Sequence, residues 1–131
     1  MTNFIELQNI AQWYPIFNNE KYILLDFTAT WCGPCKQIAP FFKELSSKYL
    51  NVTFVKVDVD KFDELCNFYD VTLMPTFVLL ENKIIKGRVN GANTEKIEKL
   101  IQTIEELDVK IVEKDQLEVF RNMKITNGTL L

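Results

Sequence analysis

The chain has 131 residues, of which 47% are hydrophobic, and this size and composition predict one soluble globular domain with its own core. The net charge of −3 comes from 15 basic and 18 acidic residues with no basic patch, so nucleic-acid binding is not supported. No histidine is present, which excludes a histidine-ligated zinc site, a cysteine–histidine protease pair and a histidine general base.

The first part of the chain alternates predicted strands and helices. Residues 3–6 are compatible with a short strand, and residues 7–17 carry apolar side chains at helical spacing, although Pro15 predicts a kink or an end of that helix. Residues 18–20 predict a turn. The run 22–28 is almost continuously apolar, which is typical of a strand buried on both faces of a sheet.

A longer helix and a second buried strand follow. Residues 34–49 predict a helix with an inward apolar stripe and a kink at Pro40. Residues 52–58 predict a strand, and residues 61–69 a short helix with Cys66 on its apolar side. Free cysteines are among the most buried residues, so we expect Cys66 to be an unreactive thiol, with a regulatory role as the alternative.

The last elements predict an antiparallel hairpin and a final helix. Residues 76–80 and 84–89 form the two strands of the hairpin. Gly91 then breaks the chain, and Thr94 is the predicted N-cap of a helix that runs to Leu107. The order β-α-β-α-β-α-β-β-α predicts an α/β fold, in which helices cover both faces of a mixed sheet.

The run Trp31-Cys32-Gly33-Pro34-Cys35 lies at the predicted junction between a strand and a helix. Two thiols at this spacing can close a small disulfide ring and reopen it, which is a reversible two-electron switch. A zinc or iron–sulfur site needs a second pair of ligands, and only Cys66 remains, so no metal is expected. Three cysteines also argue against a structural disulfide framework.

The motif at residues 31–36, with Asp26-Phe27 before it and Met74-Pro75-Thr76 after it, resembles the thioredoxin family. The resemblance runs from about Phe4 to Leu107 and is greatest to eukaryotic cytosolic thioredoxins. It implies the thioredoxin fold, with a central mixed five-stranded sheet, and a protein-disulfide reductase that holds no cofactor. The implied partners are disulfide-containing target proteins and a thioredoxin reductase that uses flavin and NADPH.

The residues around the two thiols have unequal expected roles. The helix N-terminus and Lys36 stabilise a thiolate at Cys32, whose sulfur we expect to be exposed. Cys35 lies one turn further on and resolves the mixed disulfide from a more buried position. Asp26 ends an apolar run, so burial is expected to raise its pKa. The resemblance implies that Asp26 assists Cys35 through water and that Lys56 is its neighbour on the adjacent strand.

The resemblance also implies a shallow apolar groove that accepts an extended substrate segment beside the dithiol. Met74-Pro75 is implied to be a cis peptide facing the dithiol, and the residue before the proline is implied to pair with the substrate backbone. A purely structural proline at the start of a strand is the alternative for Pro75, as core packing is for Trp31. The groove residues implied in this way are Trp31, Gly33, Pro34, Met74, Pro75, Gly91 and Ala92.

Two features depart from the family pattern. Asn82-Lys83 stands in the hairpin turn where glycine is usual, so a strained or differently typed turn is expected. Residues 108–131 lie beyond the domain at 1–107 and are rich in apolar side chains. We expect this C-terminal extension to carry a short amphipathic helix that packs on the domain or on a partner, and a frayed extension is the alternative.

The expected location is the cytoplasm, because the start of the chain shows neither a secretory signal nor a transit peptide. The longest apolar runs are too short to span a membrane, and a monomer is expected. The alternative function is a thioredoxin-like binding module or subunit whose tail recruits a partner. An oxidant or isomerase is a third alternative, which the Gly33-Pro34 spacer and the missing secretory signal disfavour.

Overall fold

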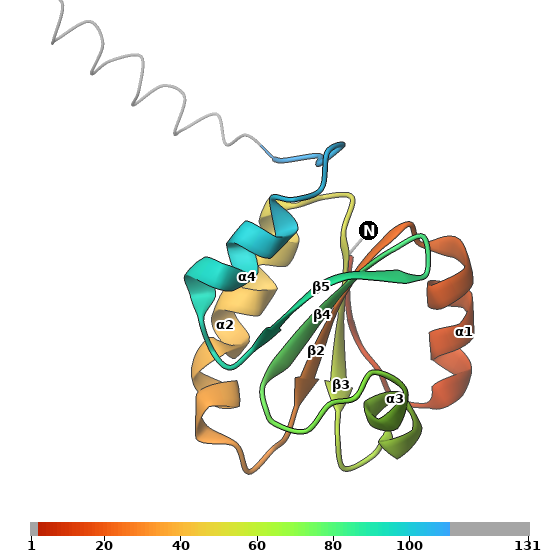
Figure 1. Cartoon of the computed structure of the whole chain (residues 1–131), viewed down its shortest axis with the longest axis vertical. Coiled ribbons are helices and arrows are strands. Elements are labelled where there is room, and N and C mark those ends of the chain that lie inside the picture. The colour runs from red at the N-terminus through yellow and green to blue at the C-terminus, as the bar shows by residue number, and fades with distance from the viewer. Residues whose placement is uncertain (1–2, 111–131) are drawn as a thin grey trace, which may run out of the picture.

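The computed structural model describes residues 3–110, which form a five-stranded sheet between two layers of helices (Figure 1). The elements in chain order are β1 (Phe4–Glu6), α1 (Ile10–Asn19), β2 (Tyr22–Thr28), α2 (Gly33–Lys48), β3 (Thr53–Asp58), α3 (Asp63–Phe68), β4 (Thr76–Glu81), β5 (Ile84–Asn90) and α4 (Thr94–Ile101). The predicted order of strands and helices and the α/β class are confirmed.

The sheet has the strand order β1-β3-β2-β4-β5 and is mixed. β1, β3 and β2 run parallel, whereas β4 pairs antiparallel with both β2 and β5. α2 and α4 cover one face of the sheet, and α1 and α3 cover the other (Figure 1). All seven residues of the central strand β2 are buried, as its apolar run predicts.

β2 separates two halves of the core, because successive side chains of a strand point to opposite faces. Leu24 packs with side chains of α2 and α4, whereas Ile23, Leu25 and Phe27 pack with those of α1 and α3. Asp26 is two residues after Leu24, so its carboxyl group points to the α2 side of the sheet. The alternation of side chains along β2 therefore places the Asp26 carboxyl group on the face of the sheet that is covered by α2, the helix that begins at the two cysteines.

α1 does not end at Pro15, and the predicted turn at residues 18–20 begins only after Asn19. The helix starts with a capping box in which the Asn9 side chain accepts from the Gln12 N–H. Its apolar side, which includes the buried Trp13, anchors it to the sheet. Pro15 is exposed, and so is Ala11, the residue four positions earlier whose carbonyl loses its N–H partner. α2 likewise continues past Pro40 to Lys48.

α4 differs from the prediction at both ends. Its N-cap is Asn93 and not Thr94, because the Asn93 side chain accepts from the Lys96 N–H at 3.0 Å. The helix ends at Ile101, six residues before Leu107, and tighter turns follow in which Ile104 N–H bonds to the Ile101 carbonyl. Ile104 is nevertheless buried in the core, so the apolar spacing that suggested a longer helix is satisfied by turns.

Asn82 and Lys83 form the two-residue turn between β4 and β5, and both have positive φ, at 50° and 71°. Positive φ at both central positions is typical of a type I′ turn, whose twist suits a hairpin. The expectation of a strained turn is confirmed at Lys83, because a side chain with a Cβ atom is disfavoured in this region.

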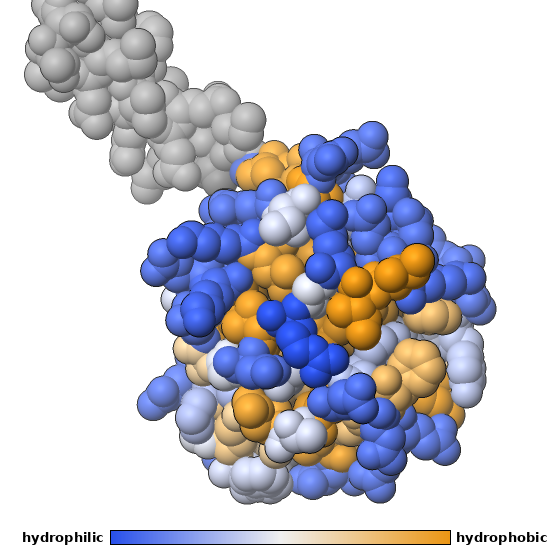
Figure 2. Space-filling view, in the orientation of Figure 1, coloured by the Kyte–Doolittle hydropathy of each residue, from blue (hydrophilic) through white to orange (hydrophobic). Residues whose placement is uncertain are grey.

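The face of the molecule over β5 mixes hydrophobic with strongly hydrophilic groups (Figure 2). Ile84, the first residue of β5, is 72% exposed.

The last described residues are held against the loop after α2. Val109 forms an antiparallel bridge with Tyr49, and the Leu50 N–H bonds to the Asp108 carbonyl at 2.8 Å. The Asn51 side chain accepts from the Asp108 N–H at 2.9 Å. The chain is thus hydrogen-bonded to the domain as far as Lys110, whereas the predicted amphipathic helix lies outside the described residues.

Candidate active site

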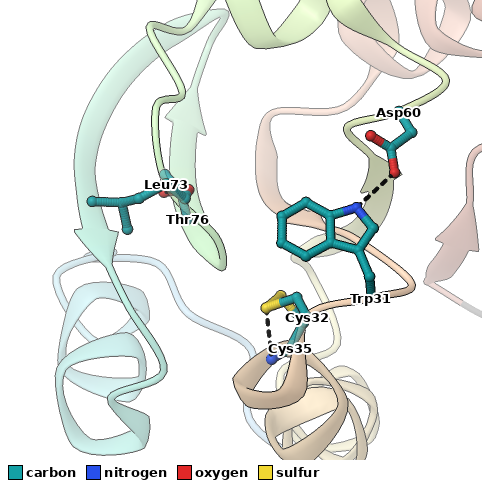
Figure 3. The surroundings of a disulfide bond; sticks show 6 residues. All are labelled: Trp31, Cys32, Cys35, Asp60, Leu73 and Thr76. Atoms are coloured by element: carbon teal, nitrogen blue, oxygen red, sulfur yellow. Dashed lines mark hydrogen bonds between the residues drawn. A yellow bond between two sulfur atoms is a disulfide. The ribbon is translucent and has the colours of Figure 1, made fainter.

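Cys32 and Cys35 lie where β2 gives way to α2, and they are joined by a disulfide with a Cα–Cα distance of 5.3 Å (Figure 3). Cys32 is the N-cap of α2, and its sulfur accepts from the Cys35 N–H at 3.3 Å. Pro34 lies in the first turn, where a missing N–H removes no helical hydrogen bond. The helix N-terminus thus presents a backbone donor and the positive end of its dipole to the Cys32 sulfur.

Both cysteines are buried in the disulfide form. Cys32 is 6% exposed and Cys35 is 3% exposed, and they form a small apolar cluster with Ala29 that Val59 and Met74 complete. The expected order of burial is correct, but the expectation of an exposed Cys32 is wrong for this state. The packing by Val59 could not be predicted from local patterns, because Val59 follows β3 and the two cysteines follow β2.

Asp26 is 2% exposed, and its Oδ1 atom has no hydrogen-bond partner among the described residues. Burial disfavours the charged carboxylate and raises the pKa of Asp26 to about 7, against an opposing effect of the Lys56 charge. The predicted rise in this pKa is therefore confirmed. A carboxyl group with a pKa near neutrality can take up and release a proton at physiological pH.

Lys56 is the register partner of Asp26 on β3, as expected for neighbours in the sheet. Its ammonium group lies 3.8 Å from Glu6, so its direct ion pair is with β1. A cavity of about 280 Å³ lies beside Lys56 and Glu6, and its lining also includes Cys35 and the exposed Lys36, but not Asp26. The cavity has room for water between the sheet and the start of α2.

Trp31 is 65% exposed beside the dithiol, so core packing is excluded for this side chain. Its indole N–H donates to the Asp60 carboxylate at 3.0 Å, and Figure 3 shows the ring between Asp60 and the disulfide. Asp60 was not predicted, because it is separated from Trp31 by 29 residues and no local pattern links the two.

Met74-Pro75 is a cis peptide, as the resemblance implied. Met74 packs against the cysteine cluster, so this peptide lies at the dithiol. The Pro75 carbonyl accepts from the Gly91 N–H at 2.7 Å, which brings the start of β4 beside the chain after β5. The Leu73 carbonyl accepts from the Thr76 hydroxyl at 2.7 Å, and these two residues lie across the disulfide from Trp31 in Figure 3.

The remaining predicted groove residues are mostly accessible. Gly33, Pro34 and Ala92 are exposed, whereas Pro75 is buried. A Cβ atom added at Gly33 would meet nothing within 4 Å, so the space above this backbone is open. Gly91 has a φ of 99°, a conformation that favours glycine.

Cys66 is half-buried on α3, less than predicted. Burial, followed by the nearby carboxylates of Asp63, Asp58 and Asp60, raises the pKa of its thiol. A thiol with a raised pKa is a poor nucleophile, in agreement with an unreactive Cys66. Within residues 3–110 no group of three potential metal ligands comes together, and no helix has the length and apolar character of a membrane span.

Comparison with known proteins agrees with these features. The Thioredoxin family model matches residues 5–106. The rice protein Thioredoxin H2-1 is 38% identical over 104 residues, which span 76% of this chain and 75% of the rice protein. Pig thioredoxin is 49% identical over 85 residues, which span 65% of this chain and 81% of the pig protein.

Solved structures of high similarity come from the same family. Thioredoxin NaTrxh from Nicotiana alata superposes with a TM-score of 0.74 at 39% identity, covering 78% of this chain and 92% of that one. Schistosoma mansoni thioredoxin gives a TM-score of 0.72 at 45% identity, covering 77% and 94%. Both proteins share the arrangement of sheet and helices that carries Cys32 and Cys35 here. The chain therefore belongs to the thioredoxin family, and its Cys32–Cys35 pair is the dithiol–disulfide couple of a protein-disulfide reductase.

Proposed function

We propose that Cys32 is the attacking thiol and Cys35 the resolving thiol of this reductase. The observation that carries the proposal is the N-cap position of Cys32, where the Cys35 N–H points at its sulfur. A thiolate at this position is stabilised by the N–H group and by the helix dipole. Cys35 lies inside the first turn and is less exposed, which suits a thiol that acts only after the target is bound.

The reaction consists of two exchange steps. The Cys32 thiolate attacks one sulfur of the target disulfide, forms a mixed disulfide and releases the other target sulfur as a thiolate. Cys35 then loses its proton, and its thiolate attacks the Cys32 sulfur. The second target sulfur leaves, and the Cys32–Cys35 disulfide forms. The two thiols thereby supply the two electrons that reduce the target.

Asp26 accepts the proton of Cys35 through water. Its pKa of about 7 and its position on the α2 side of the sheet support this role. The cavity lined by Cys35 and by Lys56, the register partner of Asp26, can hold the water of this relay. The charge of Lys56 opposes the effect of burial on Asp26, so Lys56 keeps the carboxyl group able to release its proton again. Lys36, an exposed residue of the cavity lining, adds positive charge in the first turn of the helix that Cys32 caps.

An extended segment of the target lies in a groove beside the dithiol. Met74 contributes backbone pairing groups, and the open surface above Gly33 admits the target backbone. The residues assigned to this groove are Trp31, Gly33, Pro34, Met74, Pro75, Gly91 and Ala92.

The oxidised protein is recharged by a flavin- and NADPH-dependent thioredoxin reductase and holds no cofactor of its own. We place the protein in the cytoplasm as a monomer. Its redox domain consists of residues 1–107, and residues 108–131 form an extension.

Two serine variants test the order of attack. Cys35→Ser is expected to retain target proteins as mixed disulfides through Cys32, because the second step is blocked. Cys32→Ser is expected to capture none and to reduce no insulin. Capture by Cys32→Ser alone would reverse the assignment. Failure of the wild-type protein, with both thiols intact, to reduce insulin would instead favour a binding module.

The role of Asp26 has a separate test. Asp26→Asn is expected to slow insulin reduction near pH 7 without abolishing it, because water can accept the proton less efficiently than a carboxylate. An unchanged rate between pH 6 and pH 8 would contradict the proton relay.

A further inference from the structure

Arg88 on β5 reaches across to the end of α3. Its guanidinium donates from Nη1 to the Asp70 carbonyl at 3.2 Å and from Nη2 to the Tyr69 carbonyl at 2.5 Å. Tyr69 is the C-cap of α3, and Asp70 follows it with a positive φ of 52°. Carbonyls at a helix C-terminus lack intrahelical donors, and the planar fork of arginine can serve two of them at once.

The segment fixed in this way leads directly to the dithiol. From Asp70 the chain passes without regular secondary structure to Met74, which packs against the cysteine cluster. The Val71 N–H bonds to the Cys66 carbonyl at 2.9 Å, near the Arg88 contacts. At the other end, the Leu73 carbonyl and the Pro75 carbonyl accept from Thr76 and Gly91. Between these anchors, Leu73 remains 43% exposed on the side of the disulfide opposite Trp31 (Figure 3).

We propose that Arg88 is a positioning residue for substrate binding: it holds the segment from Asp70 to Met74 in the conformation that pairs with an extended peptide. The inference rests on the proposed groove and names its substrate class, which is a disulfide carried on an extended polypeptide. A small disulfide with no peptide backbone has nothing to pair with Met74. Arg88 therefore affects the reduction of protein disulfides and leaves the reduction of small disulfides unchanged.

The physical reason lies in the entropy of the segment. Without Arg88, two carbonyls at the end of α3 lose their charged donors, and residues 70–74 gain conformational freedom. A polypeptide substrate must then order these residues when it binds, which weakens binding. The dithiol keeps its own contacts at the N-terminus of α2, so its chemistry does not change.

The test measures single-turnover oxidation of the pre-reduced full chain by insulin and by bis(2-hydroxyethyl) disulfide, with acid quenching and thiol labelling. For Arg88→Ala, the second-order rate constant with insulin is expected to fall about tenfold, the size of one lost charge-assisted hydrogen bond. The rate with the small disulfide and the reduction potential of the dithiol are expected to match the wild type. Lys86→Ala removes a cation from the same strand, in a surface pair with Glu81, and serves as the matched control.

Arg88→Lys keeps the positive charge, but an ammonium group lacks the planar pair of donors that binds both carbonyls. A partial loss of the rate constant with insulin is therefore expected. This variant decides the question if Arg88→Ala does not fold. Equal rates with insulin for wild type and variants would overturn the inference, as would an equal loss with both disulfides or a shifted reduction potential. If the wild-type protein itself shows no preference for insulin over the small disulfide, the proposed groove fails, and not only the role of Arg88.

Discussion

Replacing Asp26 with asparagine should change how the stability of the oxidised protein depends on pH. Asp26 has a pKa of about 7 in the folded chain, against an ordinary value of 3.8. Between these two values the folded state holds a proton that the unfolded state has released. Stability therefore falls as pH rises from about 4 to about 7, and it is lowest once the buried carboxyl group must ionise.

The size of the effect follows from the shift in pKa. A shift of about 3 pH units corresponds to about 4 kcal/mol of unfolding free energy, at 1.36 kcal/mol per unit. Asp26→Asn removes this pH-dependent loss. The asparagine amide is also buried without a guaranteed partner, which costs about 1–3 kcal/mol, but this cost is the same at every pH. The free energy of unfolding of the variant, relative to that of the wild type, is thus expected to increase by about 4 kcal/mol between pH 4 and pH 9.

Urea unfolding of both proteins at a series of pH values, followed by circular dichroism, measures this difference. Titrations elsewhere in the molecule cancel when the variant is compared with the wild type at each pH. Glu44→Gln removes an exposed carboxylate from α2 and controls for the loss of one negative charge. A wild-type-minus-variant difference that stays constant from pH 4 to pH 9 would refute the assignment of a raised pKa to Asp26.

Three further predictions concern other parts of the molecule. Lys56→Gln removes the charge that opposes the effect of burial, so the pKa of Asp26 should rise above about 7, visible as a higher midpoint in the same stability titration. Lys83→Gly relieves the positive φ of 71° in the hairpin and should raise the free energy of unfolding in urea by about 0.5–1 kcal/mol, whereas a loss of stability would contradict a strained turn. Tyr49→Phe deletes the hydroxyl that donates to Glu98 and should cost about 1 kcal/mol of unfolding free energy. It should also bring the lowered pKa of Glu98 closer to its ordinary value, so that the variant loses less stability than the wild type on acidification; an unchanged acid limb would exclude this bond.

The elements with strong local patterns were predictable from the sequence. The apolar run of β2 specifies a strand covered on both faces, and all seven of its residues are buried. The position of Cys32 at the start of α2 also follows from local signals, because Pro34 and the apolar spacing after it indicate where the helix begins. Asp26 could be assigned to the buried strand for the same reason.

Element ends could not be predicted where tertiary packing overrides local preference. The anchoring of Trp13 in the core keeps α1 helical through Pro15, and Ile104 reaches the core by a turn after α4 has ended. The spacing of apolar residues indicates which side chains are buried. It does not show whether a helix or a series of turns brings them into the core.

The sequence by itself determined the class of fold, the redox pair and the identity of the buried acid, because each depends on residues that are neighbours in the chain. Only the tertiary structure decided which distant groups meet at the site. The contacts of Asp60 with Trp31 and of Arg88 with the carbonyls after α3 join residues 18 to 29 positions apart. Such contacts depend on strand order and register, which set distances between segments that no local pattern encodes.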